Sequence, residues 1–455
     1  MIARTHLGWP GIIRLGLVQT ALGSIVVLTT STMNRVMVVE LALPAMLPGL
    51  LVALHYAVQI LRPRLGHGSD VGGRRTPWIV GGMLVLALGG VLAAVATAWM
   101  AVNAPAGIML AVAAFLLIGL GVGAAGTSLL VLLAKSVDPV RRAPAATIMW
   151  IMMIAGFVVT GAFAGHFLDP FSPLRLVLVT AVVAITAVVV ALLAVWNVER
   201  GTAGLGALGL KEPDGAIDGR SAPGRFRAVL AEVWAESEAR RFTIFVFVSM
   251  LAYSAQDLIL EPFAGLVFGM TPGQSTQLAG LQNGGVVLGM VLVALAAGLL
   301  GNRRLGSLRA WTFAGCVGSA IALLSLAAGG FEAATWPLKV SVLALGLSNG
   351  VFAVAAIASM MELAGAGREG REGVRMGLWG AAQAVAFGLG GLLGTVAVDA
   401  VEVFIESPAA AYGAVFAAEA LLFCMAAGLA LRVAVPGITA QQRQTRSMVA
   451  QAVNP

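Results

Sequence analysis

Long apolar runs separated by short polar loops dominate the chain. A helix needs about 20 mostly apolar residues to cross a bilayer, and by that measure the pattern predicts twelve spans. Their expected ranges are 12–36, 45–62, 78–99, 106–134, 145–167, 174–196, 242–261, 275–300, 309–329, 337–361, 376–399 and 410–431. A long polar segment at 198–241 separates the sixth span from the seventh. We therefore predict an all-α polytopic membrane protein with two six-helix halves, 1–197 and 242–435, and a polar tail, 436–455.

Composition supports this class and excludes others. The chain is 59% hydrophobic and 11% charged, whereas a soluble protein carries about 25% charged residues. The net charge of +7 is spread over short loops, so the expected surroundings are a lipid bilayer, with no nucleic acid as a partner. Cys316 and Cys424 lie in apolar runs, and no two of the four histidines are spaced at i,i+4. The sequence therefore predicts neither a disulfide framework nor a metal site.

The distribution of basic residues predicts the orientation. Lys and Arg gather on the cytoplasmic side of membrane proteins. If both termini are cytoplasmic, all of the 28 Lys and Arg residues fall on or near the cytoplasmic side except Arg35, Arg175 and Lys339. Both termini are therefore expected in the cytoplasm.

An internal repeat appears when the chain is shifted against itself by about 229 positions. The segment Gly72-Gly73-Arg74-Arg75 then falls on Gly301-Asn302-Arg303-Arg304, in a matching loop-to-helix position. Two parallel six-span halves are the organisation of the major facilitator superfamily. The repeat therefore predicts that fold.

The loop between the second and third spans resembles the signature loop of major facilitators. Gly66, Asp70, Gly73, Arg74 and Arg75 have the spacing G-x-x-x-D-x-x-G-R-R. The resemblance implies a cytoplasmic latch between the halves, in which Asp70 accepts charge-assisted hydrogen bonds. A basic residue is usual where this chain has valine at position 71, and the second copy has leucine at 299. Alternatively, Arg74 and Arg75 serve only to fix the orientation of the neighbouring helices in the membrane.

The central segment has two parts. Residues 201–224 are rich in glycine and predict a flexible linker. Residues 225–241 predict an amphipathic helix on the cytoplasmic membrane surface, with an i,i+4 pair between Glu236 and Arg240.

Ionisable residues inside spans are costly and indicate function. Arg14 and Glu261 are expected close to span ends, and Asp257 about one turn from one. Glu419 lies deeper and is the better candidate for a buried carboxylate with a partner. The fourth and tenth spans carry no internal charge, which suits an apolar cargo.

His55 stands in the second span, where an imidazole needs a partner. A hydrogen bond to a neighbouring helix is one interpretation. Axial ligation of the magnesium of a chlorin ring is the other, with Tyr56 and Gln59 nearby. His166, at the end of the fifth span, is a second pigment-binding candidate.

Residues 30–82 resemble the PucC/LhaA family. The matching motifs are N-R-V-M-V-V-E-L, starting at Asn34, and L-P-A-M-L-P-G, which contains Pro44 and Pro48. The resemblance implies an assembly factor for purple-bacterial light-harvesting complexes that handles bacteriochlorophyll in the photosynthetic inner membrane. It also implies contact with antenna polypeptides and with chlorophyll synthase or the membrane insertion machinery.

The sequence allows two interpretations of the Arg35–Glu40 pair and two of the function. Arg35 and Glu40 form either a structural ion pair or a contact for pigment or antenna. The alternative function is a major-facilitator transporter of an amphiphilic small molecule, coupled to protons through Asp257 or Glu419. An enzyme is not expected, because no nucleophile–base pair is visible.

Overall fold

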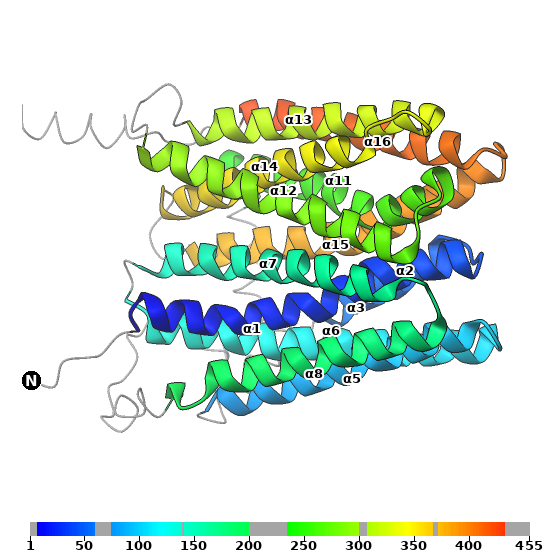
Figure 1. Ribbon diagram of the computed structural model, residues 1–455. Coiled ribbons are helices and arrows are strands. Elements are labelled where there is room, and N and C mark those ends of the chain that lie inside the picture. The colour runs from blue at the N-terminus through cyan, green and yellow to red at the C-terminus, as the bar shows by residue number, and fades with distance from the viewer. Residues whose placement is uncertain are drawn as a thin grey trace, which may run out of the picture.

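The computed structural model is a bundle of roughly parallel helices (Figure 1). It describes residues 7–59, 74–138, 141–199, 234–299, 307–366 and 372–432. Within these ranges, eleven helices are long and apolar enough to cross a membrane, and the shorter helix Met46–Val58 is apolar as well. The chain is a multi-pass membrane protein, as the apolar pattern predicts.

The first half begins with a continuous helical stretch: α1 (Trp9–Val27), η1 (Leu28–Thr32), α2 (Met33–Arg35) and η2 (Val36–Glu40). It continues with α3 (Met46–Val58), α5 (Thr76–Met100), α6 (Ala104–Ser136), α7 (Arg142–Leu168) and α8 (Pro173–Val195). The second half contains α11 (Ser237–Phe268), α12 (Pro272–Leu299), α13 (Leu308–Gly329), η6 (Gly330–Glu332), α14 (Leu338–Ala366), α15 (Glu372–Glu402) and α16 (Pro408–Arg432).

Each half has its own hydrophobic core. One core is built from residues between Ile12 and Val198, joined by Leu258 from α11. The other is built from residues between Phe242 and Ala430. Figure 1 shows the corresponding layers, with α1 to α8 on one side of the bundle and α11 to α16 on the other.

Two helix pairs make the most extensive contacts between the halves: α7 packs against α12, and α3 packs against α15. Glycine makes the first contact close, because a Cβ at Gly161 would lie only 2.7 Å from the Cα of Gly280. Such small residues let membrane helices approach.

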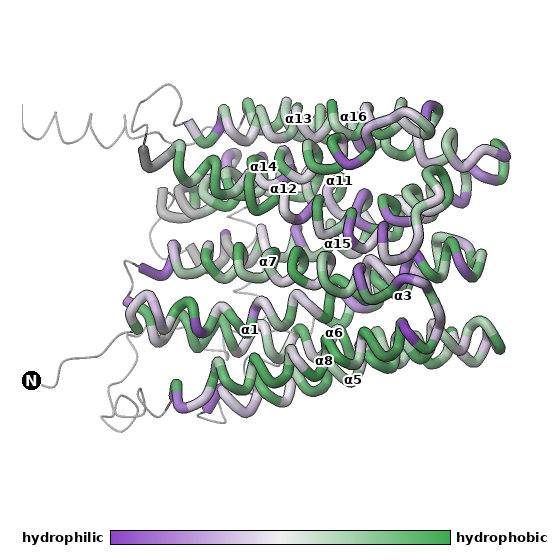
Figure 2. The backbone as a smooth tube through the Cα atoms, in the orientation of Figure 1, coloured by the Kyte–Doolittle hydropathy of each residue, from purple (hydrophilic) through white to green (hydrophobic). Residues whose placement is uncertain are grey.

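Hydrophobic residues follow the helices along most of their length, and hydrophilic ones concentrate towards the ends (Figure 2). The outer face of α8 exposes large apolar side chains, among them Leu178, Val182 and Ile185. In water this face would be unstable, whereas in a bilayer it contacts lipid tails.

The start of the second half differs from the sequence prediction. Residues 237–241 belong to α11 rather than to a separate surface helix. Glu236 does not pair with Arg240; its carboxylate binds the guanidinium of Arg375 at 2.7 Å. The pair is partly buried, with Arg375 only 2% exposed, so the stronger tertiary partner displaces the local one. Positions 225–233 of the expected amphipathic helix lie outside the described residues.

Candidate functional site: the seam between the halves

The helix that carries the N-R-V-M motif is irregular around it. Two π-helical turns, η1 and η2, flank Asn34 and Arg35. Wider turns of this kind are frequent at functional sites, because they re-aim the side chains that follow. The Thr29 hydroxyl donates to the carbonyl of Val26 at 2.8 Å within this stretch. The irregularity directs polar side chains of the first half towards the second.

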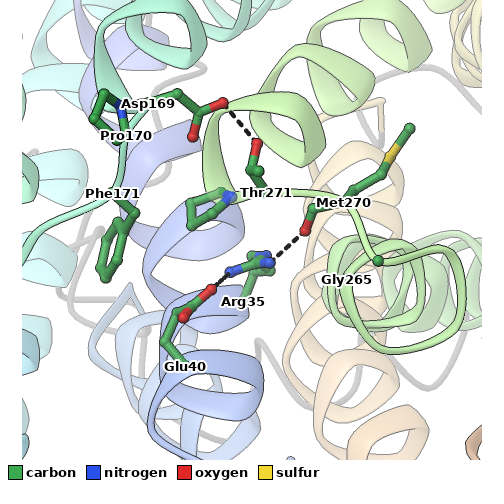
Figure 3. Close-up of a pocket in the computed structure, with 10 residues that line it drawn as sticks. Arg35, Glu40, Asp169, Pro170, Phe171, Gly265, Met270 and Thr271 are labelled. Carbon is green, nitrogen blue, oxygen red and sulfur yellow. Dashed lines mark hydrogen bonds and ion pairs between the residues drawn. The ribbon is translucent and has the colours of Figure 1, made fainter.

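Arg35 lies at the end of the bundle where α11 is connected to α12, and Figure 3 shows it between Glu40 and Met270. Its guanidinium contacts Glu40 Oε1 at 2.5 Å and donates to the carbonyl of Met270, beyond α11, at 2.5 Å. The side chain is 2% exposed. The structural ion pair suggested by the sequence is therefore present, and it also ties the first half to the second.

A cavity of about 630 Å³ lies over this pair. Besides Arg35 and Glu40, its lining consists of Asp169, Pro170, Phe171, Gly265, Gly269, Met270, Thr271 and Pro272. The lining therefore comes from both halves, with Asp169 pointing to Thr271 across the gap (Figure 3).

Below Arg35, a second polar layer joins the halves. Ser31 donates to Glu261, and Ser275 also donates to Glu261, at 3.0 Å. The Asn34 amide donates to the carbonyl of Leu258. Glu261 is 1% exposed, so the expectation that it lies near a span end is wrong. The helix continues through Pro262 to Phe268, and Glu261 is a buried contact between the halves.

Two aspartates bind helix starts across the seam. Asp169, just after α7, accepts from Gly273 N at 3.1 Å and from the Thr271 hydroxyl at 2.6 Å, at the start of α12. Asp399, in α15, accepts from Ala45 N and Met46 N at 2.8 and 2.7 Å, at the start of α3. The unpaired N–H groups and the dipole of a helix start favour such carboxylates.

These two contacts repeat the internal symmetry. Asp169 and Asp399 are 230 positions apart, one more than the repeat offset read from the sequence. One carboxylate reaches from the first half to the second, and the other reaches back. The same end of the seam is thus held by two related carboxylates, each accepting two hydrogen bonds, in addition to Arg35.

Aromatic rings form a row through the middle of the seam. The Tyr56 ring packs edge-on against the His55 ring at 4.9 Å and lies 5.7 Å from the Phe387 ring of α15. Phe387 lies 5.9 Å from Tyr253 of α11, which lies 6.2 Å from Phe352 of α14. Tyr56, Tyr253 and Phe387 are partly exposed, so the row lines the seam between the two cores.

The two histidine candidates have different surroundings. His55 is 2% exposed, and its Nε2 lies 2.9 Å from the amide nitrogen of Gln59 in the same helix. A hydrogen-bond partner of His55 therefore lies one turn further along the chain. His166 is exposed at the end of α7, with its ring 5.3 Å from that of Phe167. The structure does not bring the two histidines together.

Asp257 and Glu419 come from different helices and lie near each other. Asp257 is partly exposed on α11, one turn from both Tyr253 and Glu261. Glu419 is 2% exposed on α16, and the charge of Asp257 acts on it. Both candidate carboxylates thus belong to one region of the second half.

Most of the expected latch loop lies outside the described residues, including Gly66, Asp70 and Gly73. Arg74 is exposed and Arg75 is buried just before α5. The backbone nitrogens of Arg75 and Thr76 donate to Glu199, which lies beyond the end of α8, at 2.6 and 3.1 Å. Glu199 therefore stabilises the N-terminus of α5, a role that the loop motif does not reveal.

The family described as PUCC protein matches residues 32–438. The chain belongs to the PucC family. A relative from Rhodobacter capsulatus, named "Bacteriochlorophyll synthase 44.5 kDa chain", is 54% identical over 93% of this chain and 95% of its own length. "Protein PucC" from Cereibacter sphaeroides is 29% identical over 90% of this chain and 87% of its own. The family resemblance of residues 30–82 is confirmed and extends over most of the chain.

Solved structures show the fold. The nucleoside transporter NupG superposes with a TM-score of 0.65 and 13% identity, over 93% of this chain and 99% of its own. A bacterial homologue of the lysosomal transporter Spinster gives 0.64 and 15%, over 93% and 96%. This PucC-family chain therefore has the predicted major facilitator fold.

Proposed function

We propose that this PucC-family protein assembles purple-bacterial light-harvesting complexes and holds bacteriochlorophyll for the antenna polypeptides. The aromatic row from His55 to Phe352 carries the proposal. Ring centroids 4.9 to 6.2 Å apart have the spacing of aromatic packing, and a flat macrocycle can add to such a row. The name of the 54% identical relative refers to the same pigment.

The residues fit a ring-packing site better than a site built on one axial ligand. Nε2 of His55 lies 2.9 Å from the Gln59 amide nitrogen, so this ring nitrogen would have to leave Gln59 before it could bind magnesium. The rings of Tyr56, Tyr253 and Phe387 are partly exposed and come from both halves. Bound pigment would supply a magnesium chlorin ring. The row would hold its faces, and His55 would act as a ligand after exchanging its bond to Gln59.

The proposed role is not enzymatic. The name of one relative contains the word synthase, but the fold is shared with transporters, which bind and release their cargo unchanged. The proposed location is the photosynthetic inner membrane, with the antenna polypeptides as partners.

Removing a ring from the row tests the proposal. In Phe387→Leu we expect less bacteriochlorophyll per protein, because the link between Tyr56 and Tyr253 is lost. Tyr56→Phe keeps its ring and should keep its pigment. The measurement is the absorption spectrum of protein purified in mild detergent from a pigment-producing membrane, with co-purifying subunits identified by mass spectrometry. A colourless native protein without antenna subunits would contradict the proposal.

His55 can be tested in the same preparation. Loss of pigment in His55→Leu, with Phe387→Leu unchanged, would assign the site to axial ligation instead of ring packing. Loss in both variants would place the two residues in one site.

A second candidate function is transport of an amphiphilic small molecule, which the transporter fold and the partly exposed Asp257 favour. It predicts proton-dependent uptake of such a molecule into liposomes, abolished by Asp257→Asn. Uptake that ignores the proton gradient, or that Asp257→Asn leaves intact, would count against it. Glu406→Gln is the control, since Glu406 is exposed.

A further inference from the structure

Glu419 is a buried carboxylate for which the described part of the chain provides no hydrogen-bond donor. The residue is 2% exposed, and neither carboxylate oxygen has a partner. An ionised carboxylate in such a place costs several kcal/mol, and more so inside a membrane. Glu419 therefore requires a bound proton or another cation to remain where it is.

A second buried group without a hydrogen-bond partner among the described residues lies on α11, which packs against α16. Gln256 of α11 is 0% exposed, and neither atom of its amide has a partner among the described residues. The Phe263 ring of α11 packs on Tyr412 and Phe416 of α16, at 5.9 and 5.0 Å. Seven residues make about two helical turns, so Gln256 lies on the side of α11 that carries Phe263. By the same spacing, Glu419 lies on the side of α16 that carries Tyr412.

Asp257 connects this pair to the seam. It follows Gln256 directly, is partly exposed, and its charge acts on Glu419. The next residue on its face of α11 is Glu261, which bonds to Ser31 and Ser275. Asp257 thus lies between the buried pair and the Ser31–Glu261 bond that joins the halves.

The described helices packed against α16 carry both acidic and basic groups. Their ionisable residues are Glu238, Arg240, Arg241, Tyr253, Asp257 and Glu261 on α11, Arg309 and Cys316 on α13, Arg375, Asp399 and Glu402 on α15, and Glu332 on η6. Among them, Asp257 is the one whose charge acts on Glu419. Because that charge is of the same sign, it adds to the cost of an ionised Glu419.

We propose that Gln256, Asp257 and Glu419 form a proton-binding site between α11 and α16. Glu419 holds the proton as a neutral carboxylic acid, and the Gln256 amide faces it. Asp257 passes protons between the seam and Glu419. Binding joins one proton to one carboxylate oxygen, and no other bond is formed or broken. The proposed proton site does not depend on which molecule binds between the halves, so it can be tested without identifying that molecule.

Infrared spectroscopy of the reconstituted native protein tests the proton. We expect the carbonyl band of a protonated carboxylic acid, shifted in D₂O and lost in Glu419→Gln. Glu406→Gln should keep the band. Carbon-13 labelling of glutamate should shift it, which identifies the residue type without any substitution. Absence of the band, or its loss when sodium replaces potassium, would overturn the proposal in favour of an ionised Glu419 or a sodium site.

The exchange rate tests Asp257. Asparagine cannot pass a proton by ionising, so Asp257→Asn should slow hydrogen–deuterium exchange of the Glu419 band several-fold while the band itself remains. Glu406→Gln should leave the rate unchanged. An unaltered rate in Asp257→Asn would overturn the role of Asp257 in the site.

Discussion

Replacing Arg35 with methionine is expected to destabilise the protein by about 1.5–3 kcal/mol, the contribution of hydrogen bonds to a charged group, because Arg35 is 2% exposed and Glu40 is 33% exposed. The substitution leaves the Glu40 carboxylate and the Met270 carbonyl without the guanidinium that contacts both at 2.5 Å. It also removes the positive charge that acts on the buried Glu261. Methionine has similar length and no charge, so little of the effect comes from lost packing.

Thermal unfolding in detergent, followed by gel filtration, measures this loss. Lys339→Met is the matched control, because Lys339 is an exposed cation outside these contacts, and such substitutions usually change stability by less than about 0.5 kcal/mol. Arg35→Lys should fall between the two, since an ammonium group lacks the planar fork that reaches Glu40 and Met270 together. Equal stability of Arg35→Met and Lys339→Met would show that the pair contributes nothing.

The hydrophobic pattern was sufficient to predict the spans, because the bilayer fixes the length and the apolar character of every helix, and the internal repeat predicted the fold. The pairing of Arg35 with Glu40 could also be proposed, since the two charges are close in sequence. Glu261 was misplaced for a physical reason. Proline usually ends a helix, and the expected seventh span stopped just before Pro262. Inside a membrane, neighbouring helices let the helix continue through proline, so Glu261 lies at a buried contact.

The contacts of Asp169 and Asp399 could not be found in the same way. Each aspartate accepts from a backbone N–H group at the start of α12 or α3. Every residue type except proline has such a group, so the sequence does not mark the partner. The one available signal was the repeat, because the two aspartates are separated by nearly the repeat offset. The aromatic row was equally hidden. Tyr56 was a candidate, but Phe387 and Tyr253 become its neighbours only when α3, α15 and α11 pack.

Removing both seam aspartates is expected to open the end of the bundle that carries Arg35. Each carboxylate accepts two hydrogen bonds at a helix start of the other half, and the loss of a helix cap costs about 0.5–2 kcal/mol. For Asp169→Ala combined with Asp399→Ala we therefore expect a loss of about 1–4 kcal/mol from the closed arrangement. Since 1.4 kcal/mol is about tenfold in an equilibrium constant, the ratio of open to closed molecules should rise by about fivefold to several hundredfold.

Spin labels at positions 174 and 403 report this opening, because Leu174 and Val403 are 68% and 78% exposed and belong to different halves. The native cysteines at 316 and 424 are first replaced by alanine. We expect a population of molecules with longer label-to-label distances in the double variant. Each single variant should show a smaller population of this kind, because the two caps come from opposite halves and support the same closure. Glu406→Ala, an exposed carboxylate near the same end, should leave the distance unchanged. If the double variant kept the native distance distribution, the Arg35 and Glu261 contacts alone would suffice to hold the seam closed.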